Sequence, residues 1–228
     1  MLPDVTRSRI FDGLTEQERR TWLTAAQVRD YRRGQTVVRQ GEPADVFYLV
    51  ERGFLKLIQL TPEGQELIVR FVGPGEPFGG IVALEAASYP VTGLAIEPTR
   101  LRGWPIAALG PLLDENPQVR INIMREIATH MTDALTRVRE LATKRVGQRL
   151  AHTLLRLMRQ CGRATPDGVH ITHTLTRQEL AELTGTTLYT VSRTLSQWEA
   201  DGVIRSAGRQ LIVRSPKRLD QIARTVEE

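Results

Sequence analysis

Hydroxyl, phenol and guanidinium groups are concentrated between Gly185 and Asp201 of this 228-residue chain. Apolar residues recur there at Val191, Leu195 and Trp198, which predicts a helix with one buried face and one polar face. Arginine can bond bidentately to guanine, and hydroxyls at a helix N-terminus can bind phosphate oxygens. The polar groups predicted to contact nucleic acid are those of Thr186, Thr187, Tyr189, Thr190, Ser192, Arg193 and Gln197.

The elements that would position these groups are those of a winged helix-turn-helix. Thr176 and Glu179 have the spacing of a capping box, so a helix is predicted to begin after Thr176. Gly185 would make the sharp turn into a second helix at about 187–200. A hairpin with Gly208 in its turn would follow as the wing, with phosphate contacts from Arg205 and Arg209. The inner faces of the two helices are predicted to contain Leu180, Ala181, Leu183, Leu188, Val191, Leu195 and Trp198.

The distribution of charge supports a polyanionic partner. Residues 144–228 contain 14 Lys and Arg against 8 Asp and Glu, a balance of +6, whereas residues 1–143 contain 17 against 18, a balance of −1. The net charge of +5 therefore originates in the last third of the chain. A basic surface of this kind favours nucleic acid, although a solvated arginine-rich face would give the same count.

A long helix is predicted for the middle of the chain. Asn116 is a good N-cap, and Pro117 suits the first helical position. Apolar residues then recur at alternating spacings of three and four, which is a heptad pattern. Such a seam could belong to the core of one chain, but its unbroken repeat favours a homodimer. The predicted dimer interface consists of Ile121, Met124, Ala128, Met131, Leu135 and Val138.

The N-terminal half is predicted to be an antiparallel β-barrel of the jelly-roll type. Short apolar runs alternate there with glycine-bearing turns, and Gly64 would supply a positive φ in a hairpin. Residues 7–27, before the barrel, are predicted to be helical, with Thr15 and Glu18 as a capping box. The expected strands lie within residues 35–40, 46–53, 54–60, 66–72 and 99–105.

The predicted fold class is thus α+β, in three parts. Residues 1–115 would form the sensor barrel, residues 116–143 the dimerisation helix, and residues 144–228 the winged helix-turn-helix domain. Within the barrel, adjacent glycines before an apolar run indicate either a tight turn into a short helix or a ligand cradle of backbone N–H groups. The candidate effector pocket consists of Gly79, Gly80, Ile81, Tyr89, Val91 and Thr92.

Several classes of protein and site are disfavoured. The sequence contains neither a membrane-length apolar run nor a signal-peptide core, so the expected location is cytoplasmic. Cys161 is the only cysteine, which excludes an internal disulfide and a cysteine-ligated iron–sulfur cluster within one chain. His170 and His173 are expected to be a surface pair, with a zinc site as the lesser alternative. No nucleophile–base set, metal cluster or phosphate loop suggests an enzyme, and no cofactor is predicted.

The chain resembles regulators of the Crp/Fnr family. RGQTVVRQGEPADVFYLVERGFLKLIQLTPEGQELIVRFVGPGEPFGG resembles the family's cyclic-nucleotide-binding barrel, and TRQELAELTGTTLYTVSRTLSQWEADGVI is similar to its winged helix-turn-helix. This resemblance implies a homodimer that binds a two-fold symmetric site in double-stranded DNA, a barrel that senses a signal, and RNA polymerase as a further partner. The alternative is a barrel-type module that regulates an enzyme or another protein.

Two departures from the family pattern bear on the expected function. Cyclic-AMP binders in the family carry Gly-Glu and then Arg-Ser, whereas this chain has Gly79-Gly80 and then SYPVTG. Without that arginine a buried phosphate would lack a charge partner, so no cyclic-AMP dependence is expected and the effector is unknown. Iron–sulfur oxygen sensing lacks its cysteines, and no histidine precedes His130 to supply a ligand from the barrel. Tyr189 replaces the glutamate that many members carry, which puts the usual half-site in doubt.

Overall fold

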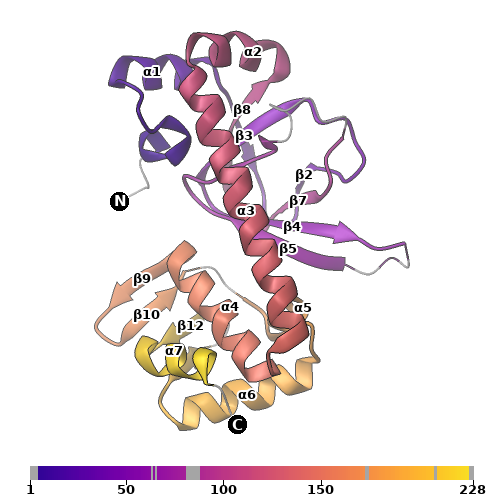
Figure 1. Ribbon diagram of the computed structural model, residues 1–228, viewed down its shortest axis with the longest axis vertical. Helices are drawn as coiled ribbons and strands as arrows, with labels where there is room; N and C mark the ends of the chain where they lie inside the picture. Colours follow the sequence, from indigo (N-terminus) through magenta and orange to yellow (C-terminus); the bar gives the residue numbers. More distant parts are fainter. Residues whose placement is uncertain are drawn as a thin grey trace. The chain divides into compact units, whose positions relative to one another are not determined.

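The computed structural model describes residues 5–62, 64, 66–80, 88–172, 175–207 and 210–225. Contacts divide the chain into two compact units, Met1–Asp133 and Ala134–Glu228. The first unit contains two β-sheets with helices, and the second contains a helical domain with a small sheet (Figure 1). The predicted α+β class is confirmed.

The two sheets of the first unit are each four-stranded and antiparallel, with strand orders β1-β8-β3-β6 and β2-β7-β4-β5. This is the architecture of a jelly roll. Among the described residues, no strand pairing joins the two sheets into a closed barrel. The strands are β1 (Gln27–Tyr31), β2 (Thr36–Val38), β3 (Val46–Arg52), β4 (Leu55–Leu60), β5 (Glu66–Val72), β6 (Pro77–Phe78), β7 (Thr92–Ala95) and β8 (Thr99–Pro105).

The helices of the first unit differ in part from the predicted ones. The capping box of Thr15 and Glu18 is confirmed, and it begins α1 (Glu16–Ala25). The prediction of helix throughout 7–27 is wrong, because short 3-10 turns precede α1 and β1 begins at Gln27. β1 is largely exposed, so its apolar residues do not alternate in a way that marks a strand. α2 (Ile106–Glu115) was not predicted.

An aromatic cluster forms the centre of the first unit. The side chains of Phe11, Trp22, Phe47 and Trp104 are fully buried, with ring centroids of neighbouring pairs 5.8–6.5 Å apart. The indole N–H of Trp104 donates to the carbonyl of Trp22 at 2.8 Å, and that of Trp22 donates to Oδ1 of Asn116 at 2.7 Å. Each buried N–H therefore has the partner that its burial requires. These bonds connect α1 to β8 and to the start of α3.

α3 (Pro117–Thr143) is the long helix that the sequence predicts, and Pro117 is its first residue. Asn116 precedes it as expected, with its amide oxygen bonded to the Trp22 indole. Val119 and Ile123 are buried on one side of the helix. Other apolar side chains along α3 remain exposed, and these include most of the predicted seam.

The second unit has the topology of a winged helix-turn-helix. Its sheet is antiparallel, with strand order β11-β12-β10-β9, and Figure 1 shows this sheet and four helices in the lower part of the view. α4 buries Leu150, Leu154 and Leu157, and Cys161 lies buried in its last turn with its thiol donating to the Leu157 carbonyl at 3.1 Å. The elements are α4 (Val146–Cys161), β9 (Gly162–Thr165), β10 (Gly168–Ile171), α5 (Arg177–Thr184), α6 (Leu188–Ala200), β11 (Ile204–Ala207), β12 (Gln210–Val213) and α7 (Pro216–Arg224).

Candidate nucleic-acid interface and ligand cavity

The turn between α5 and α6 is built as the sequence predicts. Thr176 and Glu179 form a reciprocal capping box at the start of α5. Gly185 ends the helix in the left-handed conformation, at φ +59° and ψ +49°, which glycine adopts without steric cost. A Cβ at this position would lie 2.9 Å from Cδ2 of Leu141, so the close approach to α3 also favours glycine.

Arg149 of α4 holds this turn in place, a role that the sequence analysis missed. Its Nε donates to the Thr184 carbonyl at 2.8 Å, its Nη2 to the Gly185 carbonyl at 3.2 Å and its Nη1 to the Lys144 carbonyl at 3.0 Å. Carbonyl groups at the end of a helix have no intrahelical partner, and a guanidinium can satisfy several of them at once. No sequence pattern indicated this contact, because Arg149 lies about thirty-five residues before the turn.

α6 has the two faces that its sequence predicts. Val191, Leu195 and Trp198 are buried, at 0%, 1% and 6% exposure. On the opposite side Tyr189 is 73% exposed, Arg193 and Gln197 are exposed, and Ser192 is half-buried. The placement of Leu188 on the inner face is wrong, because this side chain is 48% exposed. It occupies the first turn of α6, where the helix has only begun to approach the core.

The first turn of α6 already uses some of its hydroxyl groups. Thr187 is the N-cap: its Oγ1 accepts from the backbone N–H of Thr190 at 3.2 Å and lies 2.9 Å from Oγ1 of Thr190. Thr186 is half-buried and donates its backbone N–H to the carbonyl of Ala181. A hydroxyl that accepts as a cap keeps its own proton for donation, so Thr187 can still approach a phosphate oxygen.

The wing is an antiparallel pair of β11 and β12, as predicted. Arg205 is about half-exposed and forms an ion pair with Asp167 at 2.9 Å, so a phosphate would compete with this carboxylate. Gln197 on α6 donates to the carboxylate of Asp201 at 3.1 Å. The predicted contact of Arg209, the turn glycine at 208 and the second member of the His170–His173 pair lie outside the described residues.

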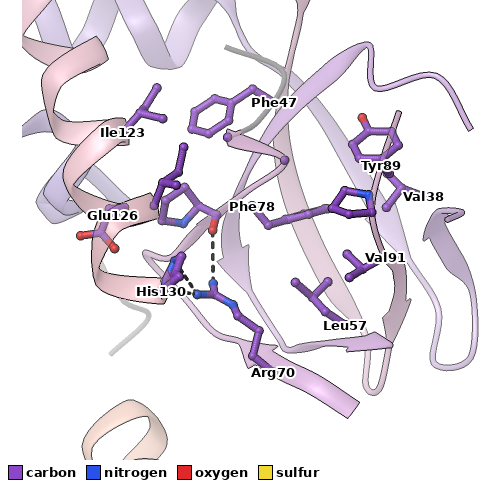
Figure 2. Close-up of a pocket in the computed structure, with 15 residues that line it drawn as sticks. Val38, Phe47, Leu57, Arg70, Phe78, Tyr89, Val91, Ile123, Glu126 and His130 are labelled. Carbon is purple, nitrogen blue, oxygen red and sulfur yellow. Dashed lines mark hydrogen bonds between the residues drawn. The ribbon is translucent and has the colours of Figure 1, made fainter. Parts of the chain in front are cut away.

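A cavity of about 200 Å³ lies within the first unit, between the jelly roll and α3 (Figure 2). Of the predicted pocket residues, Gly79, Gly80, Tyr89 and Val91 line it, whereas Ile81 lies outside the described residues. Thr92 is not among the lining residues; it lies in β7, and its Oγ1 accepts from the backbone of Gln40 at 3.0 Å. The other lining residues are Val38, Phe47, Leu57, Arg70, Pro77, Phe78, Pro90, Ile123, Glu126, Ile127 and His130.

Arg70 supplies a cation to this cavity, so the expectation that the cavity lacks one is wrong. Its Nη1 contacts the imidazole of His130 on α3, and its Nη2 lies 3.4 Å from the carbonyl of Pro77 and 3.7 Å from the carboxylate of Glu76. Burial lowers the pKa of Arg70, and burial raises the pKa of Glu126. Arg70 alternates with Ile68 and Val72 along β5, and this inward position of an arginine could have been noticed in the sequence.

Two family comparisons correspond to the two units. Residues 28–116 match the cyclic nucleotide-binding domain family, and residues 148–222 match the Crp-like helix-turn-helix domain family. The chain is 30% identical over 216 residues to the cyclic AMP receptor protein of Thermus thermophilus, which covers 95% of this chain and 97% of that protein. The chain belongs to the Crp/Fnr family of transcription regulators.

Other members of the Crp/Fnr family agree with this assignment. A CRP-like cAMP-activated global transcriptional regulator of Mycobacterium tuberculosis is 26% identical over 220 residues, covering 96% of this chain and 98% of that protein. The structure of FixK2 from Bradyrhizobium japonicum is similar with a TM-score of 0.78 and 26% identity, over 89% of this chain and 99% of that one.

Membership of the Crp/Fnr family makes the chain a DNA-binding transcription regulator rather than an enzyme. The helix-turn-helix of the second unit is the element that family members use for this purpose. In the part of the chain that the structure describes, no helix is long and apolar enough to span a membrane.

Proposed function

We propose that this Crp/Fnr regulator binds a two-fold symmetric DNA site as a homodimer, with α6 of each chain in the major groove. The observation that carries the proposal is the exposed face of α6, where Tyr189, Ser192, Arg193 and Gln197 lie opposite a buried apolar face. At about 1.5 Å per residue, Tyr189 and Gln197 are separated by about 12 Å along the helix axis, enough to reach several base pairs.

Arg193 is the residue to which we assign sequence readout. It is exposed and near the middle of this face, and its guanidinium can donate two hydrogen bonds to O6 and N7 of one guanine. Tyr189 cannot accept from cytosine as the glutamate of many family members can, so the half-site would differ at the position it faces. Thr186, Thr187, Thr190 and Arg205, together with Arg209, are assigned to the phosphates on either side.

Support for the homodimer comes from α3. Met131, Leu135 and Val138 are 64%, 60% and 63% exposed, and Ile121 and Met124 are 40% and 46% exposed, with the exposed Ala128 between them. A row of large apolar side chains in heptad register marks a surface that a second helix would cover. Two chains paired in this way would present two α6 helices, which need a separation of about 34–36 Å to enter successive major grooves. RNA polymerase is the expected partner of the DNA-bound dimer.

Arg193→Ala tests the assignment of base readout. Specific sites are first selected from random duplexes with the wild-type chain, and affinities are then measured by fluorescence anisotropy at fixed salt. The variant is expected to bind its site about tenfold to a hundredfold more weakly and to lose preference at one guanine of each half-site. Arg29→Ala, which removes the same charge from exposed β1, should leave both affinity and preference unchanged. An unchanged selected sequence for the Arg193 variant would show that the assignment is wrong.

We also propose that DNA binding does not depend on cyclic AMP. Support comes from Gly80, which stands where cyclic-AMP binders carry the ribose-binding glutamate, and from SYPVTG at 88–93, which replaces their Arg-Ser. Arg70 is a cation in the same cavity, but its two terminal nitrogens already contact His130 and the Pro77 carbonyl. The same anisotropy titration with and without saturating cyclic AMP is expected to give one binding curve. A large gain in affinity with the nucleotide would contradict the proposal.

A further inference from the structure

The cavity between the jelly roll and α3 has one polar end and one apolar end (Figure 2). Arg70, Glu126 and His130 lie at the polar end, and Val38, Leu57 and Val91 line the cavity from the strands across it. The volume of about 200 Å³ is below the range of about 300–1,000 Å³ that is usual for drug-sized ligands. The cavity therefore suits a small molecule with an apolar body and one polar group.

The polar end presents an incompletely satisfied cation. A guanidinium has five N–H groups, and the Nε–H of Arg70 is buried without a hydrogen-bond partner among the described residues. The nearest carboxylate oxygen with which Arg70 forms an ion pair, that of Glu76, is 3.7 Å away, beyond hydrogen-bond distance. A buried charge without close pairing is costly, and an anion in the cavity would remove part of that cost.

The surrounding charges were considered from every element that packs here. The carboxylates of Glu76, Glu126 and Asp133 interact with Arg70, yet burial outweighs them and lowers the pKa of the guanidinium. Burial likewise raises the pKa of Glu126, although Arg9 and Arg70 oppose this rise, while Glu76 and Asp12 add to it. Glu126 can therefore take up a proton at low cost when an anion enters. Tyr89 is not available to a ligand in the same way, because its hydroxyl donates to the Val46 carbonyl and accepts from the Val46 N–H.

We propose that this cavity binds a small organic monocarboxylate, with the carboxylate beside Arg70 and His130 and the apolar body against Val38, Leu57 and Val91. A cationic ligand would place a second positive charge beside Arg70. A neutral apolar ligand would fill the cavity but leave the buried Nε–H unsatisfied. The carboxylate satisfies the donor, and because Arg70 contacts His130 it changes a contact between β5 and α3. The regulatory consequence, though not the binding, rests on the function proposed above.

The test compares matched acids and amides on the full-length chain by isothermal titration calorimetry. Benzoate and hexanoate serve as probes, benzamide and hexanamide as their neutral counterparts, and cyclic AMP as the competing class. At least one acid is expected to bind in the millimolar range or tighter, and roughly tenfold or more tightly than its amide. Equal binding of acid and amide, tighter binding of cyclic AMP than of any acid, or no binding of any acid would overturn the proposal.

Variants locate the site of binding. Arg70→Gln should reduce the acids to the affinity of the amides, whereas Arg70→Lys should keep part of the preference. Arg100→Gln is the control, because Arg100 pairs with Asp30 on the outside of the same unit. If Arg70→Gln fails to fold, Val91→Phe decides the matter, since a larger side chain at the apolar end should abolish acid binding. Unaltered acid binding by Val91→Phe would place the ligand elsewhere and refute the proposal.

Failure here and failure of the proposed DNA function are distinguishable. Calorimetry is performed without DNA, so acid binding that is lost in the Arg70 variants supports the ligand class even if no specific duplex is ever selected. Conversely, sequence-specific DNA binding that depends on Arg193, with no acid binding, would retain the DNA function and overturn the ligand proposal alone.

Discussion

Gly185 shows how much of the candidate interface depends on one residue. The backbone of other residue types reaches its left-handed conformation only at a cost of about 1–2 kcal/mol. Gly185→Ala is therefore expected to lower the free energy of unfolding of the second unit by about 1–2 kcal/mol, measured by urea denaturation. An added Cβ would also press on Leu141, whose side chain must then move.

Gly147 provides the matched control for this prediction. It lies within α4, and an added Cβ there would meet nothing within 4 Å. Gly147→Ala should stabilise the chain by about 0.5–1 kcal/mol, because alanine loses less backbone entropy in a helix. Equal and opposite signs of the two substitutions would attribute the effect to backbone conformation. Two substitutions with the same effect would contradict it.

At the scale of elements, a buried ion pair joins the last turns of α3 to α4 within the second unit. Glu140 is 5% exposed, and its two carboxylate oxygens accept from Nη1 of Arg156 at 2.9 and 2.8 Å. His152 Nδ1 lies 3.7 Å from the same carboxylate. Removing one partner would leave the other charge largely buried and uncompensated. Glu140→Gln is expected to lower the free energy of unfolding by about 3 kcal/mol, as measured by urea denaturation.

The double substitution Glu140→Leu with Arg156→Leu tests the cause of this loss. Replacing both charges removes the uncompensated one, so the double variant should be less destabilised than the sum of the two single leucine variants. Additive losses would indicate that the pair contributes little and that packing alone is affected.

The sequence predicted most strands and the helix-turn-helix because these depend on local chemistry. Capping boxes at Thr15 and Thr176 and a glycine turn at 185 act over a few residues, and all three are present. Contacts between distant residues were not predictable in this way. Arg149 reaches the α5–α6 turn through tertiary structure, and Arg70 meets His130 across sixty residues of chain.

The candidate sites show the same division. On α6 the helical period separated buried from exposed residues correctly except at Leu188, because the first turn is not yet packed. In the cavity, four of the predicted residues line the wall, but its only strong cation among the lining residues was missed. An assumption that the phosphate-binding arginine must come from one short motif excluded an arginine supplied by a neighbouring strand.

At the scale of the whole molecule, the exposed seam of α3 predicts the oligomeric state. Leu135→Glu places a charge among apolar side chains that a partner helix would bury, so the chain is expected to elute as a monomer in size-exclusion chromatography with light scattering. Affinity for a two-fold symmetric duplex should fall with it. Leu60→Glu, at an equally apolar and 46% exposed position on β4, should remain dimeric. A dimeric Leu135 variant would show that the seam lies elsewhere.

The position of Cys161 has a practical consequence for all of these measurements. Because it is the single cysteine and is buried at the end of α4, a thiol reagent can reach it only when that helix opens. Under native conditions the rate of labelling therefore reports the opening equilibrium of the second unit, without any engineered probe. Wild-type chain, glycine variants and ion-pair variants can be compared on this one chemical clock, and DNA bound to α6 should slow it.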